Sequence, residues 1–140
     1  MDGPTHMVTY GDGVTDMNLK ELRIFHENHD KIATVTGINP ASMFGEMIVE
    51  GDQVVGFREK PTDTMNFING GYFVFDRRVL DYLTDDSVSD LETHTLVNLA
   101  NDGELMVHRH GGFWACMDNQ RDVDNLNDLW LRGEAPWKVW

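Results

Sequence analysis

Apolar residues recur along this chain in short segments whose spacing alternates between that of a strand and that of a helix. Residues 7–10 form a short apolar run that leads into a predicted polar turn at residues 11–13, and residues 32–38 are apolar and β-branched, which is typical of a buried strand. Between them, residues 18–30 carry apolar side chains at helical spacing, with Asp16 or Asn18 as the predicted N-cap. The order strand, helix, strand predicts one βαβ unit of a largely parallel sheet.

The second half of the chain continues this alternation after an inserted hairpin. Residues 46–59 alternate apolar and polar positions around Gly51 and Asp52, which predicts two strands joined by a tight turn. Residues 68–75 predict a strand whose glycines let another backbone or a ligand come close. The remaining segments are predicted helices over residues 77–83, 91–101 and 120–132 and predicted strands over residues 104–108 and 112–117. The pattern is that of an α/β protein, and the length of 140 residues is that of one domain.

Composition and charge exclude several classes of function. The net charge of −13 and the pI near 4.6 argue against a nucleic-acid partner, because affinity for a phosphate backbone requires clustered lysine and arginine. No segment approaches the roughly 20 apolar residues that cross a bilayer, and residues 1–6 lack the pattern of a signal peptide. Cys116 is the one cysteine and excludes an intrachain disulfide, so we expect a soluble protein of the reducing cytoplasm without a membrane partner.

Two aspartates that follow predicted strands are candidates for metal-ion chemistry. Asp12 lies between two glycines, where a bulky phosphate can reach its carboxylate, although a turn aspartate without a ligand is the alternative. Asp118 follows the strand over residues 112–117 and equally suits the N-cap of the last helix. The two carboxylates together suit Mg²⁺, which binds one or two carboxylates and otherwise water and phosphate oxygens.

A charged turn, the histidines and the C-terminal aromatic residues are further candidate sites. Lys60 suits a phosphate and Glu59 suits sugar hydroxyls, whereas the alternative is a solvated charged turn. Six histidines are present, but no third ligand joins either closely spaced pair, so zinc is not predicted. The tryptophan-rich residues 136–140 are interpreted as a docking tail.

Short motifs follow one another in a recognisable order from residue 7 to residue 140. They are residues 8–14 (VTYGDGV), 44–45 (FG), 57–61 (FREKP), 68–74 (INGGYFV), 103–106 (GELM), 112–114 (GFW), 117–118 (MD), 121–122 (RD) and 135–140 (APWKVW). In this order they resemble the glucose-1-phosphate cytidylyltransferases, which are sugar-1-phosphate nucleotidyltransferases. The resemblance implies an α/β fold, namely a partial, Rossmann-like nucleotidyltransferase fold with a mixed sheet, flanking helices and an inserted β-hairpin.

The resemblance also implies a reaction and a role for each matching residue. In the family, the sugar-1-phosphate oxygen attacks the α-phosphorus of CTP in line and pyrophosphate leaves. Asp12 and Asp118 match the aspartates that hold Mg²⁺, and Lys60 matches the lysine on the sugar phosphate of glucose-1-phosphate. The implied substrate-binding residues are Gly11, Glu59, Asn69 and Gly70.

Departures from the family pattern limit what we expect of this chain. The N-terminal half of such enzymes, with its glycine-rich nucleotide-binding loop, has no counterpart here, and Met43 and Asn119 replace usual residues. We therefore expect residues 1–140 to form one domain, equivalent to the C-terminal sugar-phosphate half, that is inactive alone and is completed by a separate N-terminal chain. The alternative is a non-catalytic binding or assembly module. In either case the open edge of the strand beginning at Met7 predicts a homo-oligomer.

Overall fold

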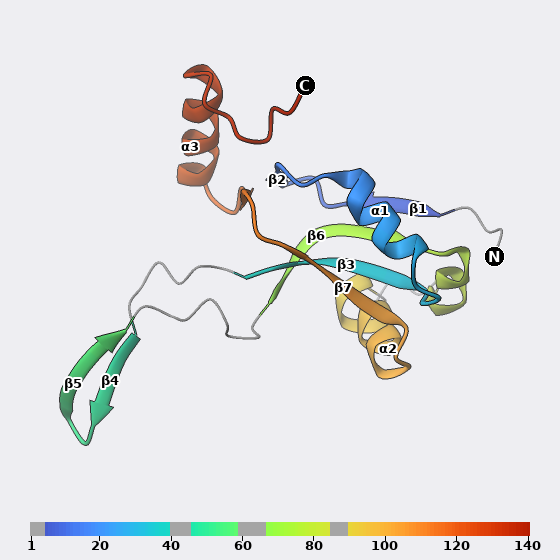
Figure 1. Cartoon of the computed structure of the whole chain (residues 1–140), viewed down its shortest axis with the longest axis horizontal. Helices are drawn as coiled ribbons and strands as arrows, with labels where there is room; N and C mark the ends of the chain where they lie inside the picture. Colours follow the sequence, from blue (N-terminus) through green and yellow to red (C-terminus); the bar gives the residue numbers. More distant parts are fainter. Residues whose placement is uncertain (1–4, 40–45, 59–66, 85–89) are drawn as a thin grey trace.

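The protein is built around a mixed four-stranded sheet (Figure 1). The computed structural model describes residues 5–39, 46–58, 67–84 and 90–140. The strands of the sheet are β1 (His6–Thr9), β3 (Ala33–Ile38), β6 (Ile68–Phe75) and β7 (Leu105–His110), in the order β1-β6-β3-β7. Strand β6 is antiparallel to both β1 and β3, whereas β3 and β7 are parallel.

The sheet confirms one prediction and corrects another. The mixed sheet with flanking helices that the resemblance implies is confirmed. The largely parallel sheet predicted from local order is wrong, because β6 inserts between β1 and β3, the two strands of the predicted βαβ unit, and pairs antiparallel with both. Periodicity reports which faces of a strand are buried but not which strand lies beside it.

Helix α1 (Leu19–Glu27) covers one face of the sheet (Figure 1). It begins at Asn18, whose side chain accepts a hydrogen bond from the backbone N–H of Lys20 at 3.0 Å, so the predicted cap at Asn18 is confirmed. Leu22 is fully buried and packs with Met17 and with Val74 of β6. This small cluster fixes the helix against the sheet.

The other face carries three short helical segments. They are η1 (Arg77–Tyr82, a 3₁₀ helix), η2 (Leu91–Thr95, a π-helical turn) and α2 (Leu96–Asn101), which continues directly from η2. Phe73 and Phe75 of β6 point to this side and pack with Val79 and Leu99. Because side chains alternate along a strand, the run from Phe73 to Phe75 supplies both cores, which is why β6 is buried on both faces.

Two pairs of strands lie outside this sheet. The predicted hairpin is confirmed as β4 (Glu46–Glu50) and β5 (Gln53–Arg58), joined through Gly51 at φ 62°. A second pair, β2 (Gly13–Thr15) with β8 (Trp114–Cys116), forms a short antiparallel ribbon. This β2–β8 ribbon is only half predicted, because residue 13 was assigned to a turn.

Helix α3 (Gln120–Leu131) and the tail that follows it end the chain. The tail turns back so that the ring of Trp137 stacks on Phe113 at a centroid distance of 5.7 Å, which agrees with the predicted docking tail. Trp140 remains 79% exposed. Within the described ranges, no helix has both the length and the apolar character to cross a membrane.

Burial lowers the pKa of three histidines, and this gives the fold a predictable pH dependence. His26 and His29 both contact the hydroxyl of Thr34, at 2.9 and 2.7 Å, and His108 packs edge-on against Phe25. Desolvation is the main cause of the lowered pKa in all three, and for His26 the neighbouring charge of His29 adds to it.

We predict that the free energy of unfolding decreases as the pH falls from about 7.5 to about 5.5. The folded histidines stay neutral over part of this range while the unfolded chain takes up protons near its ordinary pKa of about 6.5, so protons favour the unfolded state. Urea unfolding at both pH values measures the loss. His108→Leu removes one of the three histidines and should reduce this loss of unfolding free energy. An equal loss in His108→Leu and in the wild type would contradict the explanation.

Candidate functional site

The β2–β8 ribbon brings the two candidate aspartates to one end of the molecule. In its register Gly13 lies opposite Cys116, and the backbone N–H of Met117 donates to the carbonyl of Asp12 at 2.9 Å. Asp12 therefore immediately precedes one strand of the ribbon, and Asp118 follows the other strand by two residues. Two acids far apart in the sequence are adjacent because antiparallel pairing places the start of one strand beside the end of its neighbour.

A cavity of about 150 Å³ lies between this end of the ribbon and β6. Of the predicted site residues, Asp12, Asp118, Asn69 and Gly70 line it. Gly11 lies in the same turn as Asp12 but does not line the cavity. Glu59 and Lys60 lie outside the described residues, so their predicted roles stay predictions. The other lining residues are Tyr10, Gly13, Gly71, Tyr72, Trp114 and Cys116.

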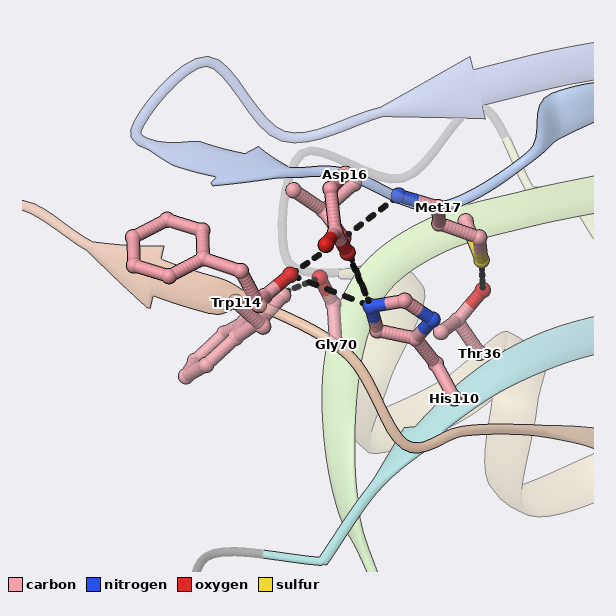
Figure 2. A network of polar contacts seen from close by, with 8 residues as sticks. Asp16, Met17, Thr36, Gly70, His110 and Trp114 are labelled. Carbon is pink, nitrogen blue, oxygen red and sulfur yellow. Dashed lines mark hydrogen bonds and ion pairs between the residues drawn. The ribbon is translucent and has the colours of Figure 1, made fainter. Parts of the chain in front are cut away.

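Two hydrogen bonds from aromatic side chains attach the ribbon to β6. The hydroxyl of Tyr72 donates to the carbonyl of Gly13 at 2.9 Å, and the indole N–H of Trp114 donates to the carbonyl of Gly70 at 2.8 Å. Figure 2 shows Trp114 beside Gly70. A Cβ at position 70 would lie 2.9 Å from Cγ1 of Ile38, so the absence of a side chain lets β6 approach its neighbour here.

A polar network at the cavity includes two residues that the sequence analysis missed. The hydroxyl of Tyr10 donates to Oε1 of Glu92 at 2.6 Å and accepts from Nδ2 of Asn69 at 3.2 Å. Oδ1 of Asn69 accepts from the backbone N–H of Gly71 at 2.8 Å. Burial and the bond to Glu92 raise the pKa of Tyr10 to about 12, so its hydroxyl stays protonated at neutral pH. Asn69 is thereby held in one orientation by a neutral phenol and a carboxylate.

No feature of the sequence indicated Glu92 as a site residue, since it lies in a short helical turn and belongs to no motif. Tyr10 stands within the YGDG motif that drew attention to Asp12, so its position beside the turn was a usable signal.

Negative charge concentrates around Cys116. Its thiol donates to Oδ2 of Asp118 at 3.2 Å, and its pKa is raised to about 11, first by burial, then by Asp118, and also by the charge of Asp12. Both candidate aspartates therefore lie close enough to act on one thiol. An anionic pocket of this kind favours a bound cation.

Asp118 is not the N-cap of α3. The cap is Asn119, whose Oδ1 accepts from the backbone N–H of Asp122 at 3.1 Å, while the carboxylate of Asp122 accepts from the backbone N–H of Asp118 at 3.2 Å. The capping interpretation of Asp118 is therefore wrong, and its carboxylate is left to the cavity and to Cys116.

The two carboxylates suit Mg²⁺ rather than a metal whose ligands must all be protein side chains. Among the described residues, no group of three or more histidine, cysteine or acidic side chains is placed to hold a metal. Two carboxylates beside an open cavity are nevertheless enough for Mg²⁺, which usually keeps several waters or phosphate oxygens. Asp12 and Asp118 fit such a site.

The family model for nucleotidyl transferases matches residues 2–133. This chain belongs to the nucleotidyl transferase family. It is 43% identical over 136 residues to a probable glucose-1-phosphate cytidylyltransferase of Bacillus subtilis, covering 97% of this chain and 53% of that protein. It is also 43% identical over 139 residues to the glucose-1-phosphate cytidylyltransferase of Salmonella typhi, covering 99% of this chain and 54% of the relative.

More distant nucleotidyl transferases are similar as well. A mannose-1-phosphate guanylyltransferase of Mycobacterium tuberculosis is 31% identical over 142 residues, covering 94% of this chain and 38% of that protein. A crystal structure from Bacillus anthracis, provisionally named a glucose-1-phosphate thymidylyltransferase and bound to sucrose, superposes with a TM-score of 0.60 at 16% identity. It covers 89% of this chain and 54% of that one, and it supports the fold alone. The chain spans about half the length of the cytidylyltransferases it matches.

A pair of glycine variants tests the packing of the nucleotidyl transferase pocket. Gly71 has φ 76°, and a Cβ there would lie 2.8 Å from the ring of Tyr10, whereas Gly103 has φ 70° and open space around it. Gly71→Ala and Gly103→Ala should each lose about 1–3 kcal/mol of unfolding free energy to backbone strain. Gly71→Ala should lose about 1–3 kcal/mol more, because the ring of Tyr10 must move. Urea unfolding measures both, and equal losses would show that Tyr10 does not pack on Gly71.

Proposed function

We propose that this chain provides the sugar-phosphate and magnesium half of a glucose-1-phosphate cytidylyltransferase active site. The whole reaction joins CTP and glucose-1-phosphate to give CDP-glucose and pyrophosphate. The observation that carries the proposal is that Asp12 and Asp118 line one cavity together with Asn69 and Gly70. The 43% identity to the cytidylyltransferases named above supports the choice of base and sugar.

Each side chain has a separate task in this proposal. The network of Tyr10, Asn69 and Glu92 presents a fixed set of polar atoms to the hexose, so little order has to be gained on binding. Asp12 and Asp118 hold Mg²⁺, which when bound neutralises charge on the phosphates. Lys60 and Glu59, assigned from their motif, contact the sugar phosphate and the sugar hydroxyls. Transfer of this kind depends on positioning and charge neutralisation more than on covalent catalysis by the protein.

We further propose that the site is completed by another polypeptide surface. The cavity of about 150 Å³ is smaller than the roughly 300–1,000 Å³ of a complete small-molecule pocket. The relatives are about twice as long, and in this proposal the nucleotide is bound by the part of such an enzyme that residues 1–140 do not include. This chain then binds glucose-1-phosphate but does not release pyrophosphate from CTP by itself. The free thiol of Cys116 supports the reducing cytoplasm as the compartment.

Titration calorimetry with glucose-1-phosphate and Mg²⁺ tests the half-site. Asp12→Asn and Asp118→Asn should each weaken binding by more than about 10-fold, because they remove a negative charge and an oxygen ligand from the cation. Lys60→Ala should weaken sugar-phosphate binding in the same direction. Asp52→Asn, the same change in the exposed turn between β4 and β5, is the matched control and should bind as the wild type does.

Several outcomes would count against the half-site. Absence of sugar-phosphate binding by the wild type would refute it, and so would binding by both aspartate variants that is as tight as that of the wild type. Pyrophosphate release by the pure chain would refute only the proposed dependence on a second surface.

One observation favours an assembly module as the second candidate function. Strand β1 lies at the edge of the sheet and is exposed along its length, with Met7 and Val8 at 45% and 40%. An exposed apolar edge strand pairs readily with another chain. We therefore predict a homodimer or larger oligomer in sedimentation at micromolar concentration. Val8→Lys should shift it toward monomer, and a wild-type monomer would contradict this candidate.

A further inference from the structure

His110 lies where three segments of the chain meet and is not among the residues that line the cavity. Figure 2 shows its ring pointing at Asp16. Its Nε2 atom is 3.0 Å from the carbonyl oxygen of Phe113, 3.1 Å from Oγ1 of Thr15 and 3.1 Å from Oδ1 of Asp16. One ring nitrogen from the end of β7 thus contacts both sides of the β2–β8 ribbon.

The chemistry of these three oxygens determines where the proton is. A carbonyl and a carboxylate only accept hydrogen bonds. The hydroxyl of Thr15 donates to the carbonyl of Phe113 at 2.8 Å, so its oxygen is left to accept, as it does from the backbone N–H of Met17 at 3.2 Å. Every oxygen facing Nε2 is therefore an acceptor, and Nε2 must carry hydrogen.

Loss of this contact would be destabilising because of Asp16. Its Oδ1 is buried and, among the described residues, receives no hydrogen bond of good geometry, so the imidazole at 3.1 Å is the contact that compensates it. The packing leaves little freedom, because a Cβ at Gly112 would lie 2.5 Å from Oδ1 of Asp16 and 2.9 Å from Cε1 of His110. Removal of the imidazole N–H would leave the buried Oδ1 of Asp16 without a donor, while the hydroxyl of Thr15 would still donate to the carbonyl of Phe113.

We propose that His110 is a positioning residue, which fixes the β2–β8 ribbon to the main sheet and so holds Asp12 and Asp118 at the cavity. Each ribbon strand is only three residues long, and a short pair of strands is not stable by itself. Tyr72 and Trp114 attach the ribbon near the cavity, and His110 attaches its other end, where β2 ends and β8 begins. The effect on ligand binding rests on the proposed function, whereas the attachment itself does not.

Cys116 supplies a readout that requires no ligand. It is the one cysteine of the chain, lies half-buried on β8, and donates to Asp118. A ribbon that detaches from the sheet exposes this thiol, so its rate of reaction with a thiol reagent such as DTNB reports local opening. Urea unfolding of each variant separates local opening from global loss of stability.

The variants are chosen so that a general loss of packing is distinguishable. His110→Leu keeps the volume and removes the donor. His110→Gln places an amide N–H near the position of Nε2 and should restore the wild-type labelling rate and ligand binding. His108→Leu is the matched control two residues earlier on β7: the Nδ1 atom of His108 is buried and, within the described part of the chain, has no hydrogen-bond partner, so no hydrogen bond is lost there.

We expect His110→Leu to raise the labelling rate of Cys116 several-fold and to weaken binding of glucose-1-phosphate with Mg²⁺ by about 10-fold or more, as loss of a supporting residue does in other metal sites. His110→Gln and His108→Leu should stay close to the wild type in both measurements. If His110→Leu does not fold, Asp16→Ala removes the buried acceptor instead and should change both measurements in the same direction.

Wild-type labelling in His110→Leu would overturn the proposal, as would equal effects in His110→Leu and His108→Leu at equal stability. If the wild type binds no sugar phosphate, the proposed function fails, and the labelling rates alone still decide whether His110 holds the ribbon.

Discussion

The attachment of a three-residue ribbon to the central sheet is the constraint on which the candidate site depends. Asp12 and Asp118 stand at the end of that ribbon, and Asn69 and Gly70 stand on β6. The carbonyls of Gly13 and Gly70 receive the hydroxyl of Tyr72 and the indole N–H of Trp114. These hydrogen bonds join the ribbon that carries the carboxylates to β6, the strand that lines the other side of the cavity.

The sheet beneath the ribbon is stabilised from both faces by small cores. Leu22 with Val74 closes one face, and Phe73, Phe75 and Leu99 close the other. Each core is modest, so the rigidity of β6 results from burial on both sides rather than from one large cluster.

The sequence predicted the elements that carry a long or regular pattern. Buried β3 and β6, the hairpin around Gly51, the cap at Asn18 and helix α3 followed from periodicity and turn residues. The antiparallel insertion of β6 did not, because pairing partners leave no periodic trace.

Other features escaped prediction for definite physical reasons. Strand β2 is too short to show a period of two, and its glycine was interpreted as part of a turn. For the site, four of the seven predicted residues line one cavity, but Glu92 contacts Tyr10 only through the tertiary fold. The attachment through His110 was likewise invisible, since a histidine near the end of a strand has many possible partners.

A shared cation at Asp12 and Asp118 is tested most directly by titrating the isotope-labelled chain with Mn²⁺ in place of Mg²⁺, followed by amide NMR. We expect substoichiometric Mn²⁺ to broaden the amide signals of residues 11–13 and 117–119 together, and Asp118→Asn to abolish the effect at both segments. Broadening at one segment alone, or at scattered acidic residues, would show that the two aspartates do not share a cation.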